Sequence, residues 1–393
     1  MKEGWTYKRL GDICTIERGG SPRPIDAFIT TEDKGFNWIK IGDAVEGSKY
    51  ISSTKEKIKP EGLKKTRFVH KGDFILSNSM SFGKPYILNI DGCIHDGWLV
   101  IHDENDTFDK SFLYYLLGSP NMYREFKRLA VGGVVNNLNS KVVRDVIVPV
   151  PPLQEQERIV AELELLTGII DKQKQQFKEL DTLAQSIFYD MFGNPVENEK
   201  GWHCMNLREI ASFKNGLNYT NKKSGRLVKV LGVSDFQNRS FVDSSEIGCV
   251  HIDDCFDDDY YLNDDDIVFV RSNGSKALIG RSVRVLTQGE NITYSGYCIR
   301  CRITSPLIIS PYLAAFVKTE QIHNVLTTGG RGCNIQNLNQ TTLGDLIIPI
   351  PPLAIQNSFT KKIQSIKSQK ESINCSIAES QKLFDYTMDK YFG

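Results

Sequence analysis

The chain has 393 residues, of which 40% are hydrophobic and 24% are charged, as in a globular protein of two or three domains. No apolar run could span a bilayer and the N-terminus has no secretory signal pattern, so we expect a cytoplasmic protein without membrane contact, its nine cysteines reduced. The 48 basic and 48 acidic residues cancel, so net charge does not indicate a nucleic-acid partner.

The first lobe, residues 1–150, is predicted to be an α+β domain dominated by short strands. Apolar runs such as FILSNS, YILNI and WLVIH are separated by Gly, Pro, Asn and Asp, and one amphipathic helix is predicted near 112–129. Three of its loops combine basic, amide and small residues, which can contact phosphates and base edges of DNA. The candidate DNA-binding residues are Arg18, Ser21, Arg23, Asn78, Ser79, Ser81, Lys84, Asn136 and Asn137.

Residues 151–193 are predicted to form one long helix. Apolar side chains recur every three or four positions after the Pro-Pro pair, which is the spacing of a coiled-coil seam. The predicted pairing residues are Ile159, Leu163, Leu166, Ile170, Phe177, Leu180 and Ile187.

The second lobe, residues 194–350, repeats the first. The segment NLNSKVVRDVIVPVPPLQEQ at 137–156 recurs as NLNQTTLGDLIIPIPPLAIQ at 337–356, 200 residues later, and such self-similarity indicates a duplicated structural unit. Strands are predicted in DIVFVRSN, SVRVLT and YCIRCRIT, and a helix near 311–326. The candidate DNA-binding residues are Lys214, Asn218, Tyr219, Lys222, Lys223, Arg226, Arg271, Asn273, Ser275, Lys276, Arg331, Asn334 and Gln336; ordinary polar surface loops are the alternative interpretation in both lobes.

Residues 351–393 are predicted to form a second long helix, with Ile363, Ile366, Ile373, Ile377 and Phe384 on its seam. The seams are interrupted at different positions, since Gln173 aligns with Ile373 and Ile170 with Lys370. Residues 151–193 carry four basic and eight acidic side chains, whereas 351–393 carry six and four. We therefore expect the helices to pair with each other, rather than each packing only on its own lobe.

Several other patterns do not predict chemistry. Cys298 and Cys301 lie in an alternating strand pattern, where positions i and i+3 face opposite sides, so no zinc site is expected. The acidic cluster at 253–266 lacks the order of a calcium loop and is expected to be solvated, with a DNA-excluding edge or a protein contact as alternatives. Both Pro-Pro pairs are followed by Leu instead of the Tyr of an adenine methyltransferase, and no ATP-binding P-loop or nucleophile elbow is present.

The chain consists of a lobe, a Pro-Pro-Leu-x-x-Gln motif and a long helix, followed by a second copy of all three. This order resembles the specificity (S) subunit of type I DNA restriction-modification enzymes. The resemblance covers the whole chain and is carried by the two NLN-to-PPL segments, by QEQERIV at 154–160 and by the GGSPRP loop. It implies two tandem target recognition domains, each followed by a long helix, with the helices pairing as an antiparallel coiled coil of pseudo-twofold symmetry.

The resemblance also implies a function. Double-stranded DNA would be read as a bipartite, asymmetric site, because two different lobes on one frame meet two half-sites at a fixed separation. Two methyltransferase subunits, and two restriction subunits in a full enzyme, would dock on the helices. S-adenosylmethionine, ATP and magnesium are expected on those partners, with no cofactor, metal or catalytic residue in this chain. The alternatives are an adaptor whose lobes bind proteins or glycans, and an autonomous enzyme.

Overall fold

A computed structural model describes residues 2, 4–45, 47–78, 82–130, 138–219, 225–236, 241–252, 256–328 and 337–393. The chain forms two compact units. Unit 1 consists of Met1–Lys174 together with Cys375–Gly393, and unit 2 consists of Gln175–Asn374. Each unit therefore combines one lobe with parts of both long helical segments.

The main sheet has the same topology in both units. Its five strands follow the order β2-β11-β8-β9-β5 in unit 1 and β14-β21-β18-β19-β16 in unit 2. In each case the last neighbours are parallel and the others antiparallel. The strands are β2 (Thr15–Arg18), β5 (Tyr50–Ile51), β8 (Phe74–Ser77), β9 (Pro85–Leu88), β11 (Trp98–His102), β14 (Ala211–Asn215), β16 (Phe241–Asp243), β18 (Ile267–Val270), β19 (Ser282–Leu286) and β21 (Cys298–Ile303).

A second sheet and a two-stranded ribbon are also duplicated. The second sheet has the order β3-β6-β4-β10-β7 in unit 1 and β17-β15-β20 in unit 2, and the ribbons are β1-β12 and β13-β22. The predicted tandem α+β architecture is confirmed. These strands are β1 (Thr6–Arg9), β3 (Ile29–Thr30), β4 (Phe36–Ile39), β6 (Glu56–Ile58), β7 (Arg67–Val69), β10 (Gly92–Ile94), β12 (Ile147–Val150), β13 (His203–Asn206), β15 (Arg226–Leu231), β17 (Cys249–Ile252), β20 (Ile292–Tyr294) and β22 (Ile347–Ile350).

Each lobe has two helices where the sequence predicted one. Unit 1 has α1 (Lys110–Leu117) and α2 (Pro120–Ala130), and unit 2 has α6 (Ser310–Lys318) and α7 (Glu320–Thr328). Continuous helices at 112–129 and 311–326 were therefore a wrong prediction. Pro120 has no N–H to donate, so it starts a new helix instead of continuing one. In unit 2 the extended backbone of Thr319 makes the break, and its hydroxyl donates to Phe316 O over 2.8 Å.

The two long helices are confirmed. They are α4 (Leu153–Phe192) and α9 (Leu353–Phe392), each of 40 residues and so about 60 Å long. The short helices α3 (Ser140–Asp145), α5 (Leu207–Ile210) and α8 (Gln340–Gly344) complete the set described. All the predicted seam residues are buried or half-buried.

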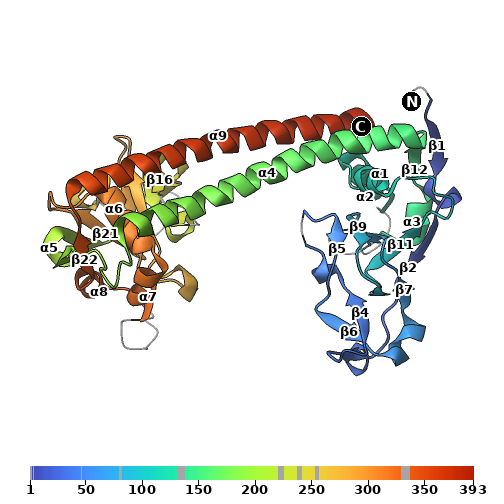
Figure 1. The fold of residues 1–393 in the computed structure, drawn as a ribbon, viewed down its shortest axis with the longest axis horizontal. Coiled ribbons are helices and arrows are strands. Elements are labelled where there is room, and N and C mark those ends of the chain that lie inside the picture. Colours follow the sequence, from blue (N-terminus) through green and yellow to red (C-terminus); the bar gives the residue numbers. More distant parts are fainter. Residues whose placement is uncertain are drawn as a thin grey trace. The chain divides into compact units, whose positions relative to one another are not determined.

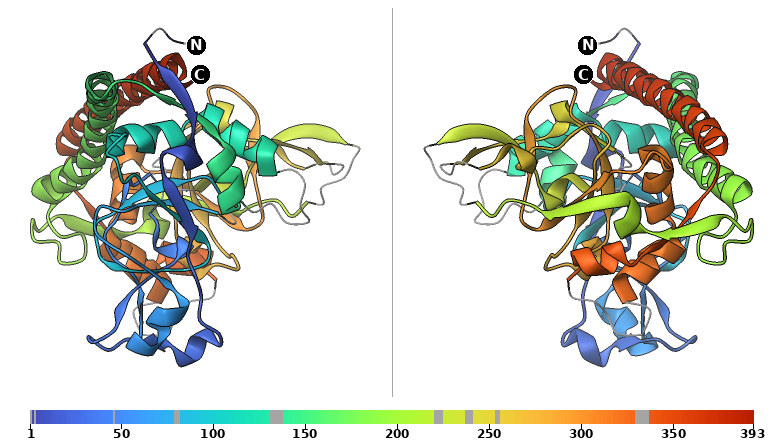
Figure 2. Two further views of the ribbon diagram at one scale, coloured as in Figure 1. Left: turned by 90° about the vertical axis from the view of Figure 1, so that its right-hand side faces the viewer. Right: turned by 90° about the vertical axis from the view of Figure 1, so that its left-hand side faces the viewer.

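Within each unit α4 and α9 lie side by side in opposite directions (Figure 1). In unit 1 the Tyr391 hydroxyl donates to Glu162 Oε2 over 2.7 Å. In unit 2 Lys370 Nζ donates to Asp181 Oδ1 over 2.6 Å. Lys2 Nζ donates to Tyr391 O over 3.0 Å, so the start of the chain lies beside the end of α9 (Figure 2).

The glutamine of the repeated Pro-Pro-Leu-x-x-Gln motif ties each long helix to its lobe. Gln156 and Gln356 are fully buried. Gln156 Nε2 donates to Thr107 O and Pro151 O, both over 2.9 Å, and its Oε1 accepts from Asp109 N over 2.9 Å. This accounts for the glutamine in both copies of the motif.

Gln356 repeats this arrangement in unit 2. Its Nε2 donates to Leu307 O and Pro351 O over 2.9 and 2.8 Å, and its Oε1 accepts from Ile309 N over 3.0 Å. The start of each long helix is therefore part of its lobe.

The hydrophobic cores also include the long helices. The core of unit 1 contains Ile159 and Leu163 of α4 and Met388, Tyr391 and Phe392 of α9. In the part of the chain that the structure describes, no helix has both the length and the apolarity of a membrane span.

Candidate nucleic-acid interface

Three loops of each lobe meet at one end of the main sheet because of the strand order. In unit 1, β2 and β8 both end where their antiparallel neighbour β11 begins. The segments that follow Arg18, follow Ser77 and precede Trp98 are thus neighbours. Unit 2 repeats the arrangement with β14, β18 and β21.

A glycine holds two of these loops together in each lobe. Gly19 N donates to Trp98 O over 2.9 Å, and Gly216 N donates to Cys298 O over 3.0 Å. A Cβ atom on Gly19 would lie 2.3 Å from His95 O, and one on Gly216 would lie 2.1 Å from a carbonyl oxygen as well. Only glycine allows this approach, so both lobes need it at this place.

In unit 1 the side chains of four residues contact Asp96. Ser21 Oγ donates to Asp96 Oδ1 over 2.7 Å, and His95 Nε2 lies 3.0 Å from the same oxygen. The backbone carbonyl of Asp96 accepts from Arg18 Nε over 2.9 Å and from Asn78 Nδ2 over 3.0 Å. Sequence reasoning selected Arg18, Ser21 and Asn78 but missed Asp96 and His95.

The loop cluster around Asp96 carries an ionised acid among several cations. Burial opposes ionisation of Asp96, but the hydrogen bond from Ser21 and the charges of His95, Arg18 and Arg23 hold its pKa below the usual value. Burial lowers the pKa of His95, opposed by Asp96 and assisted by nearby cations. His95 Nδ1 accepts from Gly97 N over 2.8 Å, so a neutral His95 carries its proton on Nε2, facing the carboxylate.

The other candidates of the first lobe are spread around this cluster. Arg23 and Lys84 are exposed, whereas Asn78 is 2% exposed and holds the loop of Asp96. Ser79, Ser81, Asn136 and Asn137 lie outside the described residues.

Unit 2 has the same backbone with different side chains. Arg271 takes the place of Asn78: its N–H donates to Tyr297 O over 2.8 Å and its carbonyl accepts from Leu338 N over 2.8 Å. The corresponding bonds of Asn78, to Gly97 O and from Leu138 N, are each 2.9 Å.

Gly296 and Asn218 take the places of Asp96 and Ser21. A Cβ atom on Gly296 would lie 2.0 Å from Asn218 Oδ1, so the glycine makes room for the exposed amide. Equivalent positions in the two lobes therefore present different hydrogen-bonding groups.

The remaining candidates of the second lobe are in several environments. Arg226 and Ser275 are exposed, Arg271 and Tyr219 are half-buried, and Asn273 Oδ1 accepts from Ser275 N over 3.2 Å. The side chain of Lys276 and the residues Lys222, Lys223, Arg331, Asn334 and Gln336 lie outside the described part of the chain.

Most of the described aspartates of the acidic cluster are exposed, as expected of a solvated cluster, but the expectation was wrong for Asp266, and two of the aspartates pair closely with cations. Asp259, the central residue of the short turn Asp258–Tyr260, accepts from Lys214 Nζ over 2.6 Å and from Arg300 over 3.2 Å. Asp266 is 2% exposed and accepts from Arg302 over 2.7 Å. The reason is the strand order, which places β14 and β21 beside each other and so concentrates cations that need counter-charges.

Cys298 and Cys301 face opposite sides of β21, as predicted. Cys298 packs in one hydrophobic cluster and Cys301 in another. Burial raises the pKa of the Cys298 thiol to about 12 and raises that of Cys301 as well. No cluster of three or more His, Cys, Asp or Glu side chains suited to a metal ion occurs among the described residues.

Two equivalent lobes with matching loop clusters, each built onto paired long helices, define a class of duplicated, helix-linked proteins. The chain belongs to the family of the type I restriction modification DNA specificity domain, whose model matches residues 2–182 and again residues 199–379.

Individual relatives agree with this family. The chain is 20% identical to the type I restriction enzyme StySPI specificity subunit of Salmonella potsdam over 396 residues, which covers 95% of this chain and 84% of that protein. It is 19% identical to the EcoKI specificity subunit of Escherichia coli (strain K12), with the same coverage of 95% and 84%.

Solved structures share the fold. A chain of a type I R-M system, solved for its complex assembly and conformational transition, matches with a TM-score of 0.65 at 18% identity, over 100% of this chain and 98% of that one. The S subunit from M. genitalium matches with a TM-score of 0.50 at 15% identity, over 99% and 96%.

Proposed function

We propose that this chain is the non-catalytic specificity subunit of a type I restriction-modification system, and that its lobes read the two halves of a bipartite, asymmetric site on double-stranded DNA. One observation carries the proposal: the lobes hold the same three loops on the same backbone but place different side chains there. Ser21 and Asp96 of unit 1 correspond to Asn218 and Gly296 of unit 2. Two lobes that share a loop backbone but present different side chains can each read a different half-site.

The chemistry of each cluster suits DNA in its own way. In unit 1 the charges of Arg18, Arg23 and Lys40 all act on His95, so cations that can contact phosphates gather there. In unit 2 the exposed amide of Asn218 can pair with the N6 and N7 atoms of an adenine.

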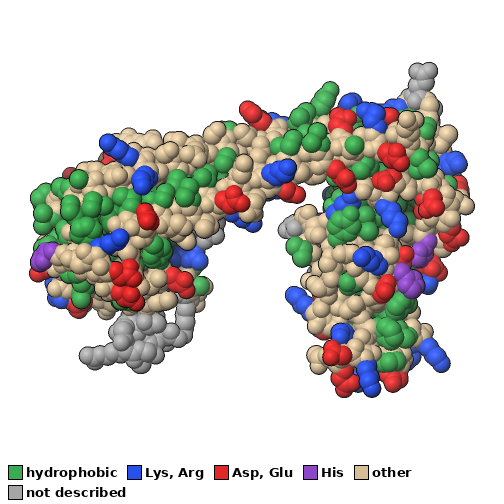
Figure 3. All heavy atoms as spheres, in the orientation of Figure 1, with side chains coloured by type: hydrophobic (Ala, Val, Ile, Leu, Met, Phe, Trp, Pro, Cys, Tyr) green, Lys and Arg blue, Asp and Glu red, His purple; other side chains and the backbone are tan. Residues whose placement is uncertain are grey.

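The outer face of the helix pair in unit 1 supports docking of methyltransferase subunits. Large apolar side chains are exposed there, namely Leu165 (65%), Ile169 (39%), Leu383 (52%) and Tyr386 (68%), and Figure 3 shows hydrophobic side chains along the exposed helix surface. Such side chains in one patch mark a protein contact.

These side chains border one another across the two helices. Leu165 shares a face of α4 with Ile169 and Glu162, and Tyr386 shares a face of α9 with Lys390. Glu162 and Lys390 form an ion pair of 3.7 Å, so the two faces adjoin. We propose two methyltransferase subunits per chain, with restriction subunits joining in the full enzyme, and S-adenosylmethionine, ATP and magnesium bound by those partners.

The experiment begins by mapping methylated adenines in cells with and without the gene, which identifies the site. Binding of the reconstituted complex to a duplex that contains this site is then measured against salt concentration. Affinity should fall steeply as salt rises, because phosphate contacts release counterions. Arg23→Ala should reduce the slope of log K against log salt by about 1.

A matched control is Lys8→Ala, which removes one charge from an exposed position of β1, away from the loop cluster. It should leave the slope unchanged. Binding that is insensitive to both salt and sequence would refute the proposal and favour an adaptor for proteins or glycans.

A further inference from the structure

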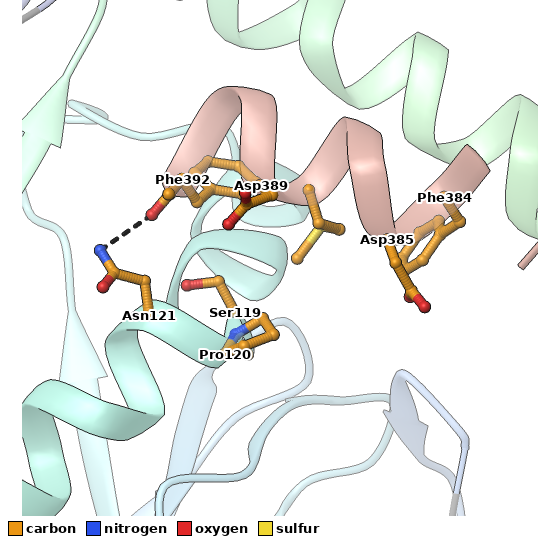
Figure 4. A pocket seen from close by; sticks show the side chains of 10 residues that line it. Ser119, Pro120, Asn121, Phe384, Asp385, Asp389 and Phe392 are labelled. Carbon is orange, nitrogen blue, oxygen red and sulfur yellow. Dashed lines mark hydrogen bonds between the residues drawn. The ribbon is translucent and has the colours of Figure 1, made fainter. Parts of the chain in front are cut away.

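A pocket of about 510 Å³ lies in unit 1 between the corner that joins α1 to α2 and the last turns of α9 (Figure 4). Ser119 and Pro120 line it from the corner, and Phe384, Met388 and Phe392 form apolar walls from α9. Phe384 is itself held by an edge-on contact with the Tyr115 ring, 6.3 Å between centroids. The volume is within the range of about 300–1,000 Å³ usual for ligand pockets.

The duplication shows what occupies the same place in unit 2. Position 389 of unit 1 corresponds to 189, and position 121 corresponds to 321. The hydroxyl of Tyr189 donates to Gln321 Oε1 over 2.7 Å. An aromatic side chain of the chain itself therefore covers the α6–α7 corner.

The residue before Tyr189 is also aromatic in unit 2 but not in unit 1. Phe188, which corresponds to Met388, stacks on Tyr312 with 6.1 Å between ring centroids and 14° between the planes. In unit 1 the residue that corresponds to Tyr189 is Asp389. Asn121 Nδ2 donates to Phe392 O over 3.0 Å, as the dashed line in Figure 4 shows. Position 389 of unit 1 therefore carries a carboxylate where unit 2 carries a ring, while Phe384, which lines the pocket, corresponds to Ala184 of unit 2.

The pocket at the α1–α2 corner and its counterpart at the α6–α7 corner also differ in charge. Asp385 and Asp389 both line the pocket and are exposed, and Gln381 donates to Asp385 Oδ1 over 2.9 Å. Among the described residues neither carboxylate has an ion-pair partner. The corresponding residues of unit 2, Gln185 and Tyr189, are neutral. The pocket therefore combines apolar walls with unpaired negative charge.

We propose that this pocket receives an aromatic side chain carried by a basic segment of a methyltransferase subunit. The inference rests on the proposed function, since it needs that partner, and it adds the residues and the chemistry of one contact. The ring would take the place that Tyr189 occupies in unit 2, and cations beside it would pair with Asp385 and Asp389. In unit 2 the chain's own Tyr189 contacts the corresponding corner. The partner's ring would therefore bind only in unit 1, and the two docking positions differ.

The test fills the pocket as the chain fills its own counterpart. The double variant Asp389→Tyr, Asp385→Gln gives unit 1 the residues that unit 2 has at these two positions, Tyr189 and Gln185. The full-length chain is titrated with a purified methyltransferase subunit and the stepwise dissociation constants are measured by native mass spectrometry and ultracentrifugation. An aromatic anchor contributes about 2 kcal/mol or more, so one of two binding steps should weaken roughly 10- to 100-fold and the other should not change.

Two further variants separate shape from charge and from nonspecific effects. Asp389→Asn with Asp385→Asn keeps the pocket open and removes the charge, and should weaken the same step by a smaller factor and reduce its salt dependence. Asp171→Tyr adds a ring and removes a charge at an exposed position of α4 outside the pocket, and should leave both steps unchanged.

The outcomes distinguish the two proposals. If the wild-type chain binds methyltransferase subunits and the filled variant binds both with unchanged affinity, the pocket inference is refuted while the specificity-subunit proposal stands. If the charge-only variant alone has no effect, the basic segment is refuted. If the wild-type chain binds no methyltransferase subunit, the proposed function fails and this inference fails with it.

Discussion

Replacing Gln156 by methionine should destabilise unit 1 and leave unit 2 largely intact. Methionine has a similar size, so the change removes hydrogen bonds without opening a large cavity. It leaves the N–H of Asp109 and the carbonyls of Thr107 and Pro151 without their partner. Each unsatisfied buried group costs about 1 to 3 kcal/mol.

Water can reach some of these groups once the packing relaxes, so we expect the free energy of unfolding of unit 1 to fall by about 3 kcal/mol. For a unit of about 150 to 250 residues this lowers Tm by about 6 to 12 °C. Thermal unfolding followed by calorimetry measures the loss. Hydrogen exchange locates it, because amides at the starts of α1 and α4 should exchange faster.

Two substitutions serve as controls. Gln356→Met should produce the same loss in unit 2, with faster exchange at the starts of α6 and α9. Gln154→Met, at an exposed position of the same turn as Gln156, should change stability by about 0.5 kcal/mol or less. A loss below 1 kcal/mol for both buried glutamines, or faster exchange spread evenly over both units, would refute the reasoning.

Three more outcomes are expected. Ser21→Asn with Asp96→Gly should alter the half-site read by unit 1 and leave the other half unchanged in a map of methylated adenines; a change in both halves would show that the lobes do not read DNA independently. Asp266→Asn leaves the partly exposed Arg302 without its buried partner and should cost about 2 kcal/mol in urea unfolding; an unchanged midpoint would contradict this. Inserting four residues at the middle of both long helices adds about 6 Å and about 400° of turn, so the unread spacer should lengthen by one to two base pairs at about 3.4 Å each. Two inserted residues turn the seam by about 200° and should abolish assembly, whereas a flexible linker would tolerate both insertions alike.

The architecture was predictable because two signals in the sequence are long and regular. The 200-residue repeat requires both lobes to share a topology, and the seam spacing from Ile159 onward is possible only on a helix. The break between α1 and α2 was missed although Pro120 signalled it. No such signal marks Thr319, since the apolar spacing continues through it and only the extended backbone ends α6.

The loop cluster was predictable only in part. Arg18 and Ser21 were selected by composition, which identifies polar and basic loops. Asp96 was missed for two reasons. A carboxylate is not expected where phosphates bind, and its contacts depend on the order β2-β11-β8. That order brings together residues about 75 positions apart, such as Ser21 and Asp96, which no local pattern reveals.

The division of unit 1 between the two ends of the sequence affects how the chain is synthesised. Its core requires Met388, Tyr391 and Phe392, which are translated about 200 residues after Lys174. Unit 2 is one continuous segment and can fold as it leaves the ribosome. At about 5–20 residues per second, the first lobe waits about 10 to 40 s with the faces of Ile159 and Leu163 uncovered. During that interval the core of unit 1 is incomplete, whereas the whole of unit 2 has been translated by Asn374.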